Sequence, residues 1–232
     1  MRCLKTQTCI DSVYGNQVVF NSREETGKLL SEKLLRLQLK NPIVIAIPRG
    51  GVVVGCEIAK RIAAELDIIA PRKMPAPHNN ELAIGAVMHD GSIFLNDEVI
   101  KASGSSPSYI EDEKAAGIRE SSRRLEQYRG IKTEPSLEGR DVILVDDGVA
   151  TGSTMEVAII WIKKHNPSRL IVAIPVIPAG ILAKLKGIVD RVVYVEAPEN
   201  FYGISQFYRI FEQVDDKEII NMLQEFWKDG RK

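Results

Sequence analysis

Short, mostly apolar runs alternate with amphipathic stretches along most of the chain. The clearest runs lie at residues 43–47 (IVIAI), 141–145 (DVILV) and 169–176 (RLIVAIPV), and shorter ones lie at 67–70 and 191–195. Apolar runs of this length without polar alternation are typical of parallel strands that are buried on both faces. The pattern therefore predicts a five-stranded parallel sheet with helices on both of its faces.

Helical spacing of apolar residues fills the segments between these runs. Ser22 and Glu25 stand three positions apart, form a capping box and predict the start of the first helix. Gly50 opens a second predicted helix, which runs to about Leu66. Further helices are expected at 109–129, at 153–165, after Pro178 and from about Asp216.

A different pattern lies between the second strand and the helix at 109–129. Two apolar runs, 81–88 and 92–96, flank the tripeptide His89-Asp90-Gly91. An Asp-Gly pair between two apolar runs favours a β-hairpin. The polar segment 103–108 is expected to be a loop.

The bulk composition narrows the class of protein. The chain has 232 residues, which fit one domain, and a formal net charge of zero, which argues against a dedicated nucleic-acid or anionic-membrane binder. No apolar run approaches the roughly 20 residues of a membrane span, and the first ten residues lack the apolar core of a signal peptide. The cysteines Cys3, Cys9 and Cys56 have no zinc-site or CxxC spacing, so a reduced, cytoplasmic setting is expected.

Candidate chemistry is concentrated directly after the run at 141–145. Asp146 and Asp147 stand at the carboxyl end of that predicted strand, where ligands bind in parallel sheets. Carboxylates accept hydrogen bonds from vicinal hydroxyls or from water on a divalent cation. The loop that follows feeds the amino end of a helix, which favours a phosphate. A ribose 5-phosphate fits, with its phosphate on Gly148, Val149, Ala150, Thr151, Gly152, Ser153 and Thr154.

Other interpretations of the paired acids explain less of the pattern. A Walker A loop needs Gly-Lys-Ser/Thr, and no lysine occurs in 141–162. A signalling receiver domain places its acid pair near the chain start and an acceptor Asp at the end of a later strand, whereas the next strand here ends in Ile174-Pro175. A plain strand–loop–helix with solvated acids leaves the phosphate-loop features as coincidence.

The stretch VILVDDGVATGST (142–154) resembles the 5-phosphoribosyl diphosphate (PRPP) signature of type I phosphoribosyltransferases. The resemblance implies an α/β fold, a parallel sheet flanked by helices, with a hairpin lid and a small hood over its edge. It also implies a single domain at 1–232. Its core would span about 41–196, and the hood would come from 17–40, 97–130 and 197–232. The whole chain is similar to a subgroup of predicted bacterial and archaeal members without a settled acceptor.

The same resemblance assigns candidate roles to particular residues. In the loop IPRGG (47–51), Arg49 and the amides of Gly50 and Gly51 would grip the diphosphate, often through an unusual backbone turn. Lys73, with Arg72 as the second choice, would also contact the diphosphate. The Pro-rich segment 74–80 and the hairpin would form the lid and exclude water.

The implied reaction uses PRPP, Mg²⁺ and a small nitrogenous acceptor, most simply a nucleobase, and releases diphosphate. Asp146 and Asp147 would orient the ribose and hold metal-bound water. Ala150 stands where the hypoxanthine-guanine branch has an Asp that is proposed to accept a proton, so this chain resembles the adenine and uracil branches instead. Glu81 is the nearest carboxylate to nominate as a general base. The resemblance also makes a homodimer possible.

Two other functions stay open at this stage. One is a non-catalytic PRPP or nucleotide sensor, and the other is a hydrolase or ribose-phosphate enzyme that uses the same pocket. The tail holds aromatic residues that would either stack on a base or pack on the sheet: Phe201, Tyr202, Phe207 and Tyr208. The histidines His78, His89 and His165 have no ligand or catalytic spacing.

Overall fold

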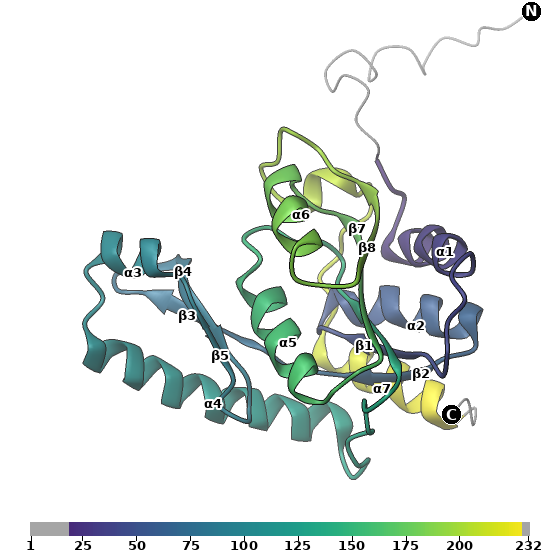
Figure 1. Ribbon diagram of the computed structural model, residues 1–232, viewed down its shortest axis with the longest axis horizontal. Coiled ribbons are helices and arrows are strands. Elements are labelled where there is room, and N and C mark those ends of the chain that lie inside the picture. Colours follow the sequence, from purple (N-terminus) through teal and green to yellow (C-terminus); the bar gives the residue numbers. More distant parts are fainter. Residues whose placement is uncertain (1–18, 229–232) are drawn as a thin grey trace, which may run out of the picture.

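A computed structural model describes residues 19–228 of the protein. Its main sheet has five parallel strands in the order β2-β1-β6-β7-β8 (Figure 1). These strands are β1 (Ile43–Ala46), β2 (Glu65–Ile68), β6 (Asp141–Val145), β7 (Arg169–Val176) and β8 (Arg191–Glu196). The predicted parallel sheet is therefore confirmed, and its apolar runs are buried as the pattern requires.

Helices cover both faces of this sheet, as Figure 1 shows. On one face, Val44 and Ala46 pack in the same core cluster as residues of α1 (Arg23–Leu34), α2 (Gly50–Ile62) and α7 (Asp216–Lys228). The other face, with Ile43 and Ile45, packs against α5 (Ser153–Lys164) and α6 (Ala179–Lys186). Successive residues of a strand point to opposite faces, so an apolar residue at every position gives each helical layer its own core.

The second helix ends earlier than its sequence pattern indicates. It was expected to reach about Leu66, with the next strand at 67–70, but α2 stops at Ile62 and β2 already begins at Glu65. Ala63 takes a left-handed conformation with φ of 52°, which ends the helix. Glu65 then pairs in parallel with Ile43. Strand pairing within the sheet therefore outweighs the local helical spacing of apolar residues.

A second, antiparallel sheet has the order β3-β4-β5 and is built from β3 (Arg72–Ala76), β4 (Asn79–Val87) and β5 (Ile93–Leu95). The predicted hairpin around Asp90-Gly91 is present as β4 and β5. The segment 74–80 is not only a lid loop, because its first residues belong to β3 and pair with β4.

Two helices follow the second sheet and pack on it. They are α3 (Asp97–Ser103), which the sequence pattern did not predict, and α4 (Pro107–Arg129), which begins two residues before the predicted 109. Buried side chains of β3 and β4 form a small cluster with residues of these helices. Together residues 72–129 form what we call the arm, which extends to the left of the main sheet in Figure 1.

The tail between β8 and α7 packs beside the start of the described chain. The backbone amide of Phe20 donates to the carbonyl of Phe207 at 2.7 Å, and the amide of Arg209 donates to the carbonyl of Phe20 at 2.8 Å. Phe20, Val176, Phe207 and Tyr208 form a separate buried cluster around the short 3₁₀-helix η1 (Ile204–Phe207). The segments 17–40 and 197–232 of the expected hood therefore meet within their described parts, whereas 97–130 builds α3 and α4 of the arm.

No described helix has the length and apolar character that crossing a membrane would need.

Candidate active site

The loops after β1 and β6 leave the main sheet side by side. The two strands pair in parallel with Ala46 opposite Val145, and the amide of Ile47 continues the ladder to the carbonyl of Val145 at 2.9 Å. β1 has β2 on one side and β6 on the other, so the chain winds in opposite directions from this pair. In doubly wound sheets such a switch point is where ligands bind, beyond the carboxyl ends of the strands.

The diphosphate-loop glycines lie in direct contact with the acidic pair. A Cβ atom added to Gly50 would stand 1.9 Å from Oδ2 of Asp147, and one added to Gly51 would stand 2.9 Å from Cα of Asp146. Only glycine permits this approach of the backbone. The Pro48–Arg49 peptide bond is cis. The structure thus brings residues 49–51 together with the two acids.

The predicted phosphate loop, 148–154, connects β6 to the amino end of α5. Gly152 precedes α5 with φ of 85°, and no side chain caps this end of the helix. The amide of Val149 donates to the carbonyl of Val176 at 3.2 Å, and a Cβ on Gly148 would stand 2.7 Å from Ile204 of η1. The loop is therefore held by β7 and the tail, while the first turn of α5 leaves amide donors free of a side-chain cap.

Arg23 forms a buried ion pair with Asp147 that the sequence pattern did not identify. Its Nε donates to Oδ2 of Asp147 at 2.6 Å, and its Nη1 donates to the backbone carbonyl of Glu212 at 2.9 Å. Its guanidinium carbon stands 4.0 Å from the ring centroid of Phe211. Arg23 is 9% exposed. One residue of α1 thus joins the acidic pair to the tail.

A signal for Arg23 was nevertheless present in the sequence. The residues of α1 that are buried recur at helical spacing: Arg23, Thr26, Gly27, Leu30, Ser31 and Leu34. Arg23 begins this stripe, so a charged residue stands where the pattern demands a buried one. A buried charge requires a partner, and only the fold reveals that the partner is Asp147.

The two acids differ in environment. Asp147 is 8% exposed, whereas Asp146 is partly exposed and accepts a 2.8 Å hydrogen bond from the backbone amide of Asp147. Loss of hydration and the adjacent charge of Asp147 hold the pKa of Asp146 well above its ordinary value, and the charge of Arg23 opposes this rise.

A magnesium site at the acidic pair would depend on the substrate. Across the described residues, no cluster of three or more His, Cys, Asp or Glu side chains is arranged to hold a metal ion. Mg²⁺ keeps several waters and often takes only one or two carboxylates together with phosphate oxygens. The pair Asp146 and Asp147 fits an ion that arrives with a phosphorylated ligand.

Arg49 faces the start of α7. Its Nη1 stands 3.8 Å from Oδ1 of Asp216, which also accepts a 2.7 Å hydrogen bond from the phenol of Tyr128. Burial, followed by the hydrogen bond with Asp216, raises the pKa of Tyr128 to about 12. Arg49 is therefore close to the tail and to the end of α4 while its backbone belongs to the loop at the switch point.

Lys73 and Glu81 both lie on the arm. The ammonium of Lys73 donates to the backbone carbonyl of Glu81, whose side chain is exposed. Among the residues that the structure describes, neither side chain forms a hydrogen bond or ion pair with the acidic pair or with 148–154. The roles expected for Lys73 and Glu81 remain predictions.

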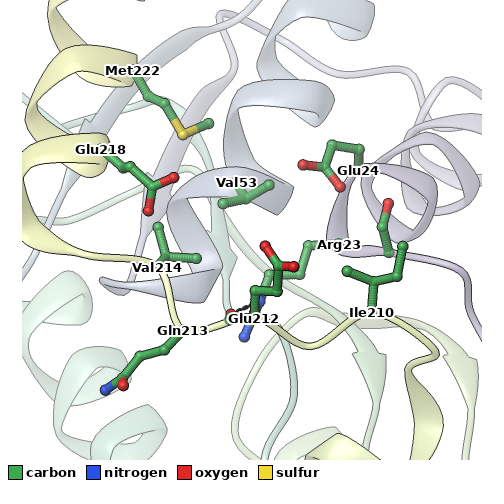
Figure 2. Close-up of a pocket in the computed structure, with 10 residues that line it drawn as sticks. Arg23, Glu24, Val53, Ile210, Glu212, Gln213, Val214, Glu218 and Met222 are labelled. Atoms are coloured by element: carbon green, nitrogen blue, oxygen red, sulfur yellow. Dashed lines mark hydrogen bonds between the residues drawn. The ribbon is translucent and has the colours of Figure 1, made fainter.

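A pocket of about 180 Å³ borders Arg23, between α1, α2, α7 and residues 210–214 (Figure 2). Its lining includes the arginine, three carboxylates and four apolar side chains: Arg23, Glu24, Glu212, Glu218, Val53, Ile210, Val214 and Met222. Arg23 therefore contacts Asp147 of the acidic pair and also lines this pocket.

The order of the main sheet defines a doubly wound α/β protein, and the two glycine-bearing loops lie at its switch point, where such folds bind ligands. The chain belongs to the phosphoribosyl transferase domain family, whose family model matches residues 21–209. The expected α/β fold of a parallel sheet flanked by helices is confirmed.

Two relatives carry a name that agrees with this family, and one solved structure is similar to the chain. Two Mycobacterium tuberculosis proteins, from strains CDC 1551 / Oshkosh and ATCC 25618 / H37Rv, are each 34% identical over 211 residues and carry the name "Putative phosphoribosyl transferase". The match covers 91% of this chain and 48% of each relative, so the chain spans about half the length of the curated relatives it matches. The crystal structure of TT1426 from Thermus thermophilus is similar with a TM-score of 0.77 and 38% identity, over 90% of this chain and 99% of that chain.

Proposed function

We propose that this protein transfers the phosphoribosyl group of PRPP to a nitrogen atom of a small acceptor, a nucleobase, and releases diphosphate. The observation that carries the proposal is the contact of Gly50 with Asp147, because it sets the loop 47–51 beside the acidic pair at the switch point. Membership of the family supports the same reaction. The cytoplasmic location and the homodimer stay predictions from the sequence.

The donor would bind along the two loops. Its 5-phosphate would accept hydrogen bonds from the uncapped amides at the start of α5. Its ribose hydroxyls would donate to the carboxylates of Asp146 and Asp147. Its diphosphate would lie against Arg49 and the amides of Gly50 and Gly51.

Much of the catalysis would then be positioning and electrostatics. As the bond between C1 and the diphosphate oxygen breaks, negative charge gathers on the leaving group, and Arg49, Lys73 and the loop amides would stabilise it. Lys73 would exchange its bond to the Glu81 carbonyl for one to the diphosphate. Mg²⁺, when bound with PRPP near Asp146 and Asp147, supplies further neutralisation of the leaving diphosphate.

The residue at position 150 indicates the class of acceptor but not its identity. Ala150 is exposed and carries no group that could accept a proton from a base. We therefore favour an acceptor of the adenine or uracil kind over a 6-oxopurine. Glu81, on the exposed start of β4, is the carboxylate nominated as general base.

Diphosphate release tests this proposal. The full chain is incubated with PRPP, Mg²⁺ and a broad panel of nucleobases, and an Asp146→Asn variant serves as the inactive control. We expect Mg²⁺-dependent release of diphosphate with at least one base. Tight PRPP binding without turnover on the whole panel would contradict the proposed transferase activity and favour a sensor. Release of phosphate instead of diphosphate would indicate a hydrolase.

A further inference from the structure

We infer that Arg23 is a positioning residue of this site: it holds Asp147 as an anchor for the surrounding segments and leaves Asp146 as the carboxylate on which the ribose contact chiefly depends. The inference rests on the proposed function and gives different tasks to two acids that the sequence motif presents as equivalent. It stands on the contacts that Arg23 makes with Asp147 and on the lack of an ion-pair partner for Asp146 among the described residues.

Arg23 uses two donors and one face of its guanidinium within the fold. One edge donates to Asp147, another donor goes to the carbonyl of Glu212, and the face lies over Phe211. The planar, forked shape of arginine serves these three partners at once, and the ammonium of lysine does not. The guanidinium is therefore fixed from three sides, and it fixes the Asp147 carboxylate in turn.

The ion pair also supports the diphosphate loop. A Cβ atom on Gly50 would stand 1.9 Å from Oδ2 of Asp147 and 2.7 Å from Nε of Arg23, so the backbone of Gly50 rests on both members of the pair. The phenol of Tyr208 donates to the backbone carbonyl of Asp147 at 2.7 Å. Four segments thus converge on this ion pair: α1, the loop after β1, the loop after β6, and the tail.

The geometry leaves different roles to the two carboxylates. Oδ2 of Asp147 is occupied by Arg23 inside the fold, and the residue is 8% exposed. Asp146 forms no ion pair with a cation among the described residues. Ribose binding would therefore depend chiefly on Asp146, which no cation holds, while Asp147 determines where the two loops stand.

Removing one member of a buried pair is more harmful than removing both, because a single loss strands the other charge without a partner. The variant Arg23→Met strands Asp147, whereas Arg23→Met combined with Asp147→Asn leaves no unpaired charge. If Arg23 acts through Asp147, the two substitutions are coupled and their effects on PRPP affinity do not multiply.

Calorimetric titration of PRPP with Mg²⁺ into the variants tests the inference. We expect Arg23→Met to weaken PRPP binding by about tenfold or more, and the double variant to bind no more weakly than Arg23→Met alone. Arg23→Lys keeps the charge and should lie between wild type and Arg23→Met. The exposed Arg36, just beyond α1, provides the matched control, and Arg36→Met should bind like wild type.

The two acids provide the second part of the test. In the Arg23→Met background, where neither acid substitution strands the Arg23 charge, Asp146→Asn should weaken PRPP binding further and Asp147→Asn should not. Equal losses, or fully multiplicative effects of Arg23→Met and Asp147→Asn, would overturn the assignment, as would an Arg23→Met variant that binds like wild type. Circular dichroism confirms that each variant is folded, and the double variant keeps the test decisive if Arg23→Met alone does not fold. Failure of the wild type to bind PRPP would instead defeat the proposed function.

Discussion

The phenol of Tyr208 donates a 2.7 Å hydrogen bond to the backbone carbonyl of Asp147. Tyr208 is 6% exposed, and its ring centroid lies 5.5 Å from that of Phe20. The tail is thereby fastened to the acidic pair through its aromatic cluster. Of the four tail aromatics considered for base stacking, Phe207 and Tyr208 are buried in packing, while Tyr202 is 91% exposed.

Removal of the Tyr208 hydroxyl should therefore weaken the fold. Tyr208→Phe leaves the Asp147 carbonyl without this donor in a buried place, which costs about 1 kcal/mol of the free energy of unfolding. Urea denaturation measures the change. Tyr202→Phe removes an exposed hydroxyl and serves as the control, with an expected change within about 0.5 kcal/mol. Equal stability of Tyr208→Phe and wild type would show that the hydrogen bond contributes nothing.

A methyl group at position 50 should disrupt the meeting of the two loops. Gly50→Ala places a Cβ 1.9 Å from Oδ2 of Asp147, so the loop or the acid must shift. We expect a loss of about 2 kcal/mol in the free energy of unfolding, together with loss of PRPP binding. Gly180→Ala in α6 meets no atom within 4 Å and should be neutral or slightly stabilising. Gly50→Ala with normal stability and PRPP affinity would contradict the packing described for Gly50.

Acid should destabilise the protein through His89. Burial lowers the pKa of His89; Arg129 and His165 act in the same direction, and Glu134 and Asp90 oppose them. Because the pKa in the folded state lies below that of the unfolded chain, the unfolded chain binds more protons as the pH falls. The contribution of neutral His89 is thus complete above about pH 6.5 and is lost as the pH drops through the lower, folded-state pKa.

The variant His89→Gln isolates this contribution. Its free energy of unfolding should fall less than that of wild type between about pH 7.5 and about pH 5.5, because the variant lacks the group that takes up the proton. Denaturation curves at a series of pH values measure both proteins. Parallel curves for the two would exclude His89 as a source of acid sensitivity.

Cys56 should be inert in the folded protein. It is 2% exposed, and burial raises the pKa of its thiol to about 12. The thiolate is the reactive form, so alkylation at about pH 8 is expected only after unfolding. Mass spectrometry of the peptide that contains Cys56, after iodoacetamide treatment with and without denaturant, checks this. Rapid labelling under native conditions would show that the thiol is accessible.

Much of the main sheet follows from local sequence. Residues 43–47 and 141–145 are apolar at nearly every position, and only a strand covered on both faces buries such runs. The hairpin could also be predicted locally, because Asp90-Gly91 stands between two apolar runs and favours a tight turn. β3 was missed, because a strand that contains Pro75 and begins with Arg72 and Lys73 has little intrinsic preference for a sheet and depends on pairing with β4.

The candidate site could be predicted from the sequence only in part, for a related reason. The motif VILVDDGVATGST and the loop IPRGG identify two segments by their own composition, and the sheet order brings them together. Arg23 reaches Asp147 across 124 positions of sequence, and Asp216 reaches Arg49 in the same long-range manner. No local pattern encodes such pairs, although the charge on the buried stripe of α1 indicates that Arg23 needs a partner.

Calorimetric titration of PRPP with Mg²⁺ tests the central claim most directly. The wild-type chain should bind PRPP, and the folded double variant Asp146→Asn with Asp147→Asn should lose that binding, because neutral amides no longer offer acceptor-only groups to the ribose hydroxyls. Unchanged PRPP affinity in the double variant, or no binding by the wild type, would contradict the assignment of this site to a phosphoribosyl donor.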